Sequence, residues 1–279
     1  MSRRAPRRCS CPLPRCRLRC WGCCSTSTPT SAPPNSRRSL ERYPRGVTPL
    51  PLRPASPNER LIVALDFDTL GEAIALVEAL GESVCWYKVG LRMFVPEGIA
   101  SVRALRERGK RVFLDLKMHD IPETVRSAAR NIAEAGVEML TVQGDADTVR
   151  AAAEGVDGRA AVLFVPMLSS QAGTNSEEVI LGRGEQALQA GASGLIVSGQ
   201  EVAAARRRFG DWVLLVSPGI RPSSAPTDDH KRSLTAGEAV RLGADYLVVG
   251  RPIRNAGDPR AAAEQMIAEV AQVSTVSGG

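Results

Sequence analysis

Short apolar segments alternate with amphipathic ones along the chain from residue 60 onward. The apolar segments are rich in β-branched side chains and run continuously, without a regular alternation of apolar and polar residues. This pattern is typical of strands that are buried on both faces of a sheet. We therefore predict eight buried strands, at residues 61–66, 84–90, 112–117, 137–142, 160–167, 194–199, 212–217 and 245–250.

The segments between these strands have the features of helices. Thr69 is an N-cap candidate, with Glu72 three residues later in capping-box spacing and Gly81 after the last apolar turn. Pro122 stands where another helix would begin, because proline suits a first helical turn. Eight strand–helix units over about 220 residues predict a single-domain α/β fold, the (β/α)8 TIM barrel. A doubly wound open sheet is the alternative, although no Gly-x-Gly-x-x-Gly motif follows the first strand.

The first 58 residues differ in composition from the rest of the chain. They hold 12 of the 36 Lys and Arg residues but one of the 30 acids, which leaves 24 basic and 29 acidic residues in 59–279. The positive net charge therefore belongs to this segment, and we expect no nucleic-acid partner for the rest. The segment is rich in Arg, Pro, Ser and Cys and lacks a hydrophobic period. We predict a disordered extension over residues 1–58 and a folded domain over residues 59–279.

Three interpretations of this extension remain open. It could bind nucleic acid, or a metal ion through Cys9-x-Cys11 and Cys20-x-x-Cys23, although the spacing lacks the paired form of a zinc site. It could be an Arg- and Ser-rich targeting peptide. It could also be dispensable, or follow from a start codon assigned too far upstream, and this is the interpretation that we favour.

Cysteine content and hydropathy indicate the cellular setting of the predicted domain. Six of the seven cysteines precede residue 58, which leaves Cys85 in the domain. A domain that does not rely on disulfides suits a reducing cytosol, so we expect a cytoplasmic protein. No run of about 18 apolar residues occurs, so we expect no association with a membrane.

Charged side chains cluster at the carboxyl ends of the first three predicted strands. Asp66 ends the first strand, and Lys88 lies near the end of the second. Asp115 and Lys117 end the third strand, and Asp120 follows in the loop. The active site of a (β/α)8 barrel lies at this end of its strands. Because unpaired buried charges are costly, we expect acids and amines to alternate and to neutralise one another. Acidic neighbours would keep Lys117 protonated, which makes it a proton donor to a carbanion.

The ends of the last two strands predict a phosphate site. Gly250 permits close approach of the backbone, and the guanidinium of Arg251 can contact phosphate oxygens. Arg221 follows the seventh strand, and Ser169 follows the fifth. The long polar loop over residues 218–233 is typical of a lid over such a site.

Several blocks of the sequence resemble the bacterial orotidine 5′-phosphate decarboxylases. The segment DLKMHDIPET (residues 115–124) resembles that family's Asp-x-Lys-x-x-Asp-Ile-Pro-x-Thr signature. The blocks VALD, KVG, VPMLSS, SPGIRP, DDHKR and DYLVVGRPI stand in the family's order, over about residues 60–272. The Asp-x-Lys-x-x-Asp core alone is less specific, because sugar-phosphate decarboxylases and aldolases of the same superfamily share it.

The resemblance implies a conversion of orotidine 5′-phosphate to UMP and CO2 that needs neither a cofactor nor a metal ion, the last step of UMP synthesis. It implies that Lys117 protonates C6 of the pyrimidine and that Asp115 lies beside the departing carboxylate. Lys88 would bond to Asp115 and the ribose, Asp66 would accept a hydrogen bond from a ribose hydroxyl, and Ser169 would contact the pyrimidine edge.

The resemblance also implies a phosphate site and a homodimer. Arg221, Gly250 and Arg251 would hold the phosphate. Asp120 and Thr124 would reach into the site of the neighbouring subunit.

The sequence departs from the family at His230, where the family usually has a Gln on the lid that bridges phosphate and pyrimidine. A His can donate one hydrogen bond and, when charged, suits phosphate, so we expect retained activity with an altered pH dependence of substrate affinity. Two alternative functions remain: a Mg²⁺-dependent sugar-phosphate decarboxylase or synthase, and a nucleotide-binding barrel without turnover.

Overall fold

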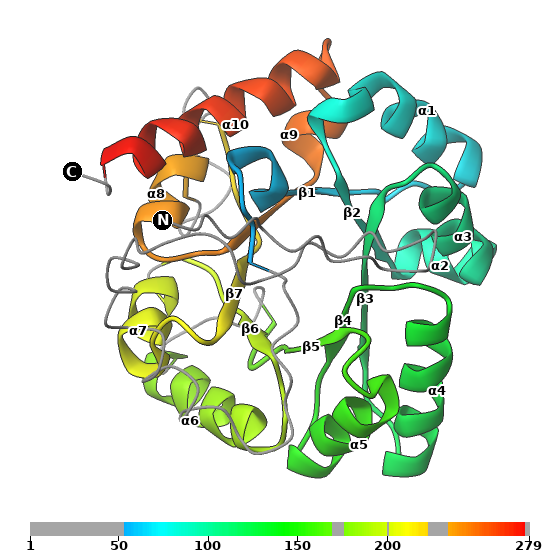
Figure 1. The fold of residues 1–279 in the computed structure, drawn as a ribbon, viewed down its shortest axis with the longest axis vertical. Coiled ribbons are helices and arrows are strands. Elements are labelled where there is room, and N and C mark those ends of the chain that lie inside the picture. The colour runs from blue at the N-terminus through cyan, green and yellow to red at the C-terminus, as the bar shows by residue number, and fades with distance from the viewer. Residues whose placement is uncertain (1–52, 169–175, 200, 223–233, 277–279) are drawn as a thin grey trace, which may run out of the picture. The chain divides into compact units, whose positions relative to one another are not determined.

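A computed structural model describes residues 53–168, 176–199, 201–222 and 234–276. Within these residues, parallel strands close into an eight-stranded barrel, and helices surround its outside (Figure 1). Each strand pairs with its neighbours in sequence, and β8 closes the barrel on β1. This confirms the predicted (β/α)8 barrel. The strands are β1 (Leu61–Ala64), β2 (Trp86–Gly90), β3 (Arg111–Met118), β4 (Met139–Val142), β5 (Ala161–Phe164), β6 (Gly194–Ile196), β7 (Leu214–Ser217) and β8 (Tyr246–Val249).

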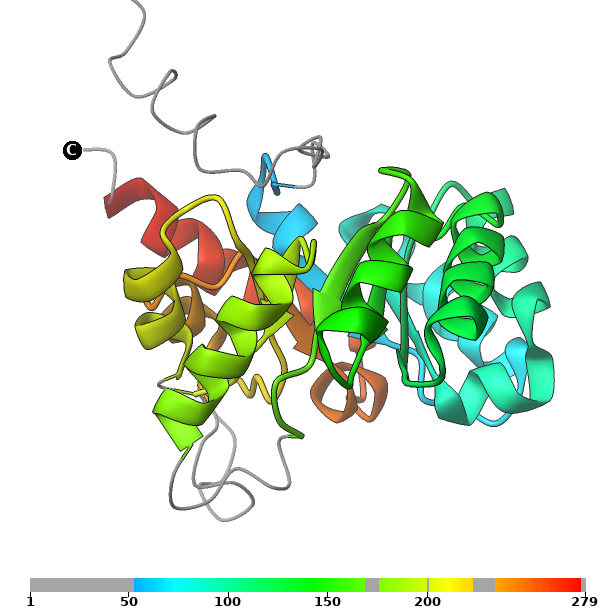
Figure 2. The same cartoon turned by 90° about the horizontal axis from the view of Figure 1, so that it is seen from below.

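The helices follow the strands and cover the outer surface of the barrel. α4 and α5 lie against each other (Figure 2), where Gly155 permits close approach, because a Cβ there would lie 2.3 Å from the backbone oxygen of Arg126. The α-helices are α1 (Leu70–Leu80), α2 (Leu91–Glu97), α3 (Ile99–Glu107), α4 (Pro122–Glu134), α5 (Ala146–Val156), α6 (Ser176–Gln189), α7 (Glu201–Phe209), α8 (Ala236–Arg241), α9 (Arg251–Arg254) and α10 (Pro259–Val276). The 3₁₀ helices are η2 (Pro57–Arg60) and η3 (Gly81–Ser83).

Local sequence signals determine where several helices begin. The hydroxyl of Thr69 accepts a hydrogen bond from the backbone N–H of Glu72 at the start of α1, and Gly81 follows its end. Pro122 is the first residue of α4. Both predicted helix starts are confirmed, since each residue satisfies or removes a backbone N–H that the helix leaves unpaired.

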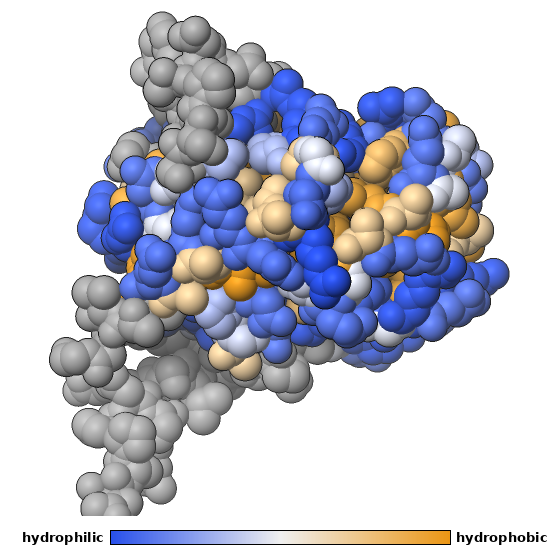
Figure 3. All heavy atoms as spheres, turned by 90° about the horizontal axis from the view of Figure 1, so that it is seen from above, coloured by the Kyte–Doolittle hydropathy of each residue, from blue (hydrophilic) through white to orange (hydrophobic). Residues whose placement is uncertain are grey.

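Apolar side chains on the two faces of the strands form two separate cores. One core fills the barrel, and the other lies between the strands and the surrounding helices. Hydrophilic residues cover much of the face seen from above, with apolar residues in bands between them (Figure 3). Burial on both faces explains why the strands are continuously apolar in sequence. The fully buried interior residues include Ile62, Trp86, Phe113, Met139, Leu163 and Tyr246.

The inward positions change from apolar to polar toward the carboxyl ends of the strands. Because inward residues are spaced by two, Lys88 follows Trp86 and Asp115 follows Phe113 on the interior of the barrel. The apolar layer therefore closes the barrel below and leaves charged groups at its mouth. No helix in the described part of the chain has the length and hydropathy needed to span a bilayer.

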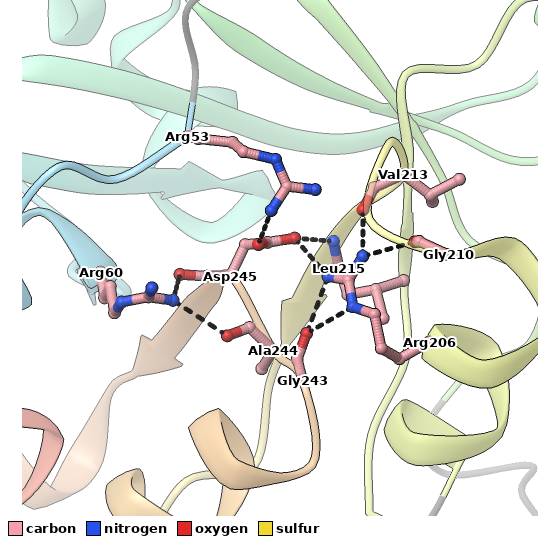
Figure 4. A network of polar contacts seen from close by, with 9 residues as sticks. All are labelled: Arg53, Arg60, Arg206, Gly210, Val213, Leu215, Gly243, Ala244 and Asp245. Atoms are coloured by element: carbon pink, nitrogen blue, oxygen red, sulfur yellow. Dashed lines mark hydrogen bonds and ion pairs between the residues drawn. The ribbon is translucent and has the colours of Figure 1, made fainter. Parts of the chain in front are cut away.

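An ion-pair network holds the other end of the barrel together (Figure 4). The buried carboxylate of Asp245, just before β8, lies 2.7 Å from Nη2 of Arg206 on α7 and 3.1 Å from Nη1 of Arg53. It also accepts a hydrogen bond from the backbone N–H of Leu215 on β7. Arg206 donates in turn to three backbone carbonyls, those of Gly210, Val213 and Gly243. Asp245 thus links α7, β7 and β8 to the segment that precedes β1.

We predict that Asp245→Asn lowers the free energy of unfolding by about 3–5 kcal/mol, because it leaves the guanidinium of Arg206 buried without its counter-charge. Urea unfolding at pH 7 measures this loss. Asp147→Asn is the matched control, because the Asp147 side chain is 68% exposed and pairs with Arg150 on the surface of α5. Its effect should stay within about 0.5 kcal/mol. Equal losses in the two variants would contradict the role given to the network.

Candidate active site

Four charged residues form a continuous chain of ion pairs at the mouth of the barrel. Nζ of Lys88 lies 3.2 Å from Oδ1 of Asp66 and 3.6 Å from Oδ2 of Asp115. Nζ of Lys117 donates to Oδ1 of Asp115 at 2.8 Å. Acids and amines therefore alternate, as the cost of burying unpaired charge led us to expect.

The carboxylate of Asp115 is the centre of this chain. Its side chain is 16% exposed. Burial by itself would raise the pKa of the carboxyl group. The charges of Lys88 and Lys117, and the hydrogen bonds from Lys117 and Thr141, lower it. The resulting pKa lies below the ordinary value for aspartate. Asp115 is thus a fixed negative charge at neutral pH, held between two ammonium groups.

The backbone around Lys117 departs from a regular strand. Lys117 has a φ of +51°, in the left-handed region, which costs a non-glycine residue about 1–2 kcal/mol. The pairing of β3 with β4 shifts register between Leu114 and Met118. The regular two-residue alternation of a strand predicted that Asp115 and Lys117 would face the same way. They do lie together, but across a bulge, which re-aims side chains in strands near active sites.

Thr141 on β4 takes the place of a strand partner at this bulge. Its hydroxyl oxygen accepts a hydrogen bond from the backbone N–H of Lys117 at 2.8 Å and donates one to Oδ1 of Asp115 at 2.9 Å. Sequence reasoning missed this residue. The available signal was a single hydroxyl in the apolar run VEMLTV, at a position that the barrel turns inward.

Arg254 on α9 is a second residue that sequence reasoning missed. It donates to the backbone oxygen of Asp66 at 2.6 Å, and its Nη1 lies 3.9 Å from Oδ2 of the same residue. Its guanidinium stacks over the ring of Phe67, 5.4 Å from the centroid. Asp66 lies two residues beyond the end of β1, where strand pairing no longer holds the backbone. The contacts with Arg254 hold it in place instead. No local pattern could reveal a contact across 188 positions of sequence.

A cavity of about 320 Å³ opens beside the ion-pair chain. The charged groups at the ends of β1 to β3 line it, and so do Arg221, Gly250 and Arg251. The predicted charge cluster and the predicted phosphate residues therefore share one cavity. Apolar side chains also line the cavity, among them Val165, Met167, Ile196 and Val248.

Two predicted site residues lie away from this cavity, and two more cannot be placed within the described residues. Asp120 and Thr124 are exposed and do not line this cavity in the part of the chain that the structure describes. The carboxylate of Asp120 accepts a hydrogen bond from the backbone N–H of Ile121 at 2.6 Å. Ser169 and His230 lie outside the described residues. Across the described ranges, no three His, Cys, Asp or Glu side chains come together as a metal site would require.

Comparison with known proteins identifies relatives over most of the chain. A sequence model of the orotidine 5′-phosphate decarboxylase / HUMPS family matches residues 59–266. An orotidine 5′-phosphate decarboxylase of Bradyrhizobium diazoefficiens is 41% identical over 227 residues, which cover 78% of this chain and 96% of that protein. The enzyme of the same name from Anaeromyxobacter sp. (strain K) is 44% identical over 223 residues, covering 76% of this chain and 98% of that protein.

Solved structures are similar over the same region. A crystal structure of orotidine 5′-phosphate decarboxylase from Lactobacillus acidophilus matches with a TM-score of 0.67 and 33% identity, covering 78% of this chain and 99% of that one. The enzyme of that name from Pyrococcus horikoshii OT3 matches with a TM-score of 0.65 and 26% identity, covering 76% of this chain and 99% of that one.

Proposed function

This chain belongs to the orotidine 5′-phosphate decarboxylase / HUMPS family, and from that premise we propose that it is a carboxy-lyase that converts orotidine 5′-phosphate to UMP and CO2 in pyrimidine biosynthesis. One observation carries the proposal. An ionised Asp115 lies between two ammonium groups in a cavity that Arg221 and Arg251 also line. Such a cavity suits a substrate with a reacting carboxylate at one end and a phosphate at the other.

The ion-pair chain supports the reaction by its charges. When the pyrimidine lies beside Asp115, the carboxylate of the substrate is repelled by the negative charge of the Asp115 carboxylate. Loss of CO2 removes that repulsion. The C6–carboxyl bond breaks, its electron pair stays on C6, and Lys117 donates a proton to that carbon. The ammonium of Lys117 stabilises the developing carbanion more than the substrate, which lowers the barrier.

The remaining predicted residues would bind the parts of the substrate that do not react. Arg221, Gly250 and Arg251 would hold the phosphate, while Lys88 and Asp66 would contact the ribose. Binding energy from the phosphate would position the ring against the charges without changing them. Ser169 at the pyrimidine edge and His230 on the lid remain part of this proposal as the sequence resemblance implies them.

A Mg²⁺-dependent sugar-phosphate enzyme is the rival within the same family description. Such an enzyme would direct its carboxylates at a metal ion. Here the ammonium of Lys88 lies between the carboxylates of Asp66 and Asp115, within 3.6 Å of both. Together with Lys117, this cation balances the charge of the two acids, and so favours the reaction that uses no metal.

We also propose a homodimer in which Asp120 and Thr124 complete the site of the partner subunit. Three exposed apolar side chains lie on elements that follow β2 and β3: Leu91 and Val95 on α2, and Ile121 just before α4. Val95 is 77% exposed and Ile121 is 67% exposed. Exposed apolar side chains on the elements that follow neighbouring strands suit contact with a second copy of the chain.

The setting and the boundaries of the enzyme complete the proposal. We propose a cytoplasmic location, which is supported by the low cysteine content of residues 59–279, in which Cys85 is a free thiol. We propose that residues 1–58 form an extension outside the catalytic domain, and the family match that begins at residue 59 supports this boundary. Arg53 precedes the boundary and contacts Asp245, so truncation close to residue 58 would remove one ion pair.

We predict that the protein consumes orotidine 5′-phosphate in an absorbance assay and that Lys117→Met slows it by at least about 100-fold, because the proton donor is lost while the apolar stem remains. Lys110→Met is the matched control. Lys110 is more buried than Lys117, and its ammonium binds the backbone oxygen of Gly81, at the other end of β3 from the cavity. Turnover should persist in EDTA. Loss of turnover in EDTA, or full activity of Lys117→Met, would refute the proposed reaction.

Mixing two inactive variants tests the dimer. Lys117→Met lacks its own proton donor, and Asp120→Ala lacks the group that it supplies to its partner. Subunit exchange should restore about a quarter of wild-type activity, because half of randomly formed dimers are mixed and each mixed dimer has one intact site. Activity of the mixture that equals the mean of the two separate variants would contradict the contribution of Asp120 across the interface.

A further inference from the structure

The conformation of Lys117 needs support from outside its own strand. Its φ of +51° is unusual for a residue with a Cβ, and the β3–β4 pairing is shifted on either side of it. A lysine keeps such a strained backbone conformation only where contacts with neighbouring residues hold it there. The contact that does so is the hydrogen bond from the Lys117 N–H to the hydroxyl oxygen of Thr141.

Thr141 also contacts the carboxylate of Asp115, to which the Lys117 ammonium donates a hydrogen bond. Its hydroxyl donates to Oδ1 of Asp115 at 2.9 Å, and Nζ of Lys117 donates to the same oxygen at 2.8 Å. The three residues therefore form a closed ring of hydrogen bonds, in which Thr141 holds the backbone of Lys117 and Asp115 holds its ammonium. The Thr141 hydroxyl therefore fixes the backbone of Lys117 directly and its ammonium through Asp115.

The surroundings of Thr141 exclude a direct part in substrate binding. Its side chain is fully buried on β4, and it does not line the cavity that the described residues enclose. A β-branched side chain has restricted χ1 freedom, so the hydroxyl is presented in a defined direction. The hydrogen bond between the Lys117 N–H and the Thr141 hydroxyl is partly buried, so loss of the hydroxyl would cost the N–H its acceptor in a place with limited access to water.

We propose that Thr141 is a positioning residue for the proton donor, which it holds in the left-handed conformation that aims its ammonium along the Asp115 carboxylate. This inference rests on the proposed decarboxylation. Without the hydroxyl, the Lys117 N–H loses its acceptor and Oδ1 of Asp115 loses a donor. The lysine then samples other directions, and proton transfer to C6 slows. Binding of the phosphate and ribose depends on other residues and changes little.

Thr141→Val, Thr141→Ser and a matched control test the inference. Valine keeps the branched shape and removes the hydroxyl, and serine keeps the hydroxyl. Thr148→Val is the control, because Thr148 is also buried and its hydroxyl also donates to an aspartate, Asp145 at 2.9 Å, but on α5. We expect kcat of Thr141→Val to fall by about 10- to 100-fold, with KM within about threefold. Thr141→Ser should recover most of kcat, and Thr148→Val should keep it.

Hydrogen exchange of the Lys117 amide gives a readout that does not depend on turnover. Exchange should accelerate in Thr141→Val, and should remain slow in Thr141→Ser and Thr148→Val. Wild-type kcat in a folded Thr141→Val variant, no rescue by serine, or unchanged exchange of the Lys117 amide would overturn the inference. If the wild type does not turn over orotidine 5′-phosphate, the proposed function fails, while amide exchange still decides whether Thr141 holds Lys117.

Discussion

The site depends on one carboxylate that is kept ionised although it is largely buried. Asp115 retains its charge because Lys88 and Lys117 approach it from two sides and Thr141 donates a hydrogen bond to it. Each partner also needs the others, since an unpaired ammonium in this place would be as costly as an unpaired acid. The charges are thus set by the folded protein before any substrate binds, which is the condition for electrostatic catalysis.

The barrel supplies the rigidity that this arrangement requires. Its apolar interior closes the lower end, and so keeps water away from that side of the charged groups at the inward positions above it. A second ion-pair network around Asp245 joins α7, β7 and β8 at the opposite end. The two networks differ in their partners: Arg206 and Asp245 also bind backbone groups of neighbouring segments, while Lys88 and Lys117 direct their ammonium groups at side-chain carboxylates.

Much of this arrangement could be predicted from the sequence, and the reasons for the exceptions are physical. Continuous apolar runs identify strands buried on both faces, and Asp66, Lys88, Asp115 and Lys117 at their ends identify the mouth of the barrel. The bulge at Lys117 could not be predicted, because it comes from the register of β3 against β4. For the same reason Thr141 and Arg254 were missed, since each acts through contacts with residues far away in sequence.

Titration of the Asp115 carboxyl group shows directly whether its two ammonium neighbours keep it ionised. Carbon-13 NMR of aspartate-labelled protein, with the Asp115 signal assigned by comparison with Asp115→Asn, follows its ionisation as the pH falls from 7. We expect a midpoint clearly below about 3.9, the ordinary value for aspartate, and a higher midpoint in Lys88→Met, because one of the two ammonium groups is then missing. A wild-type midpoint at or above the ordinary value would contradict it.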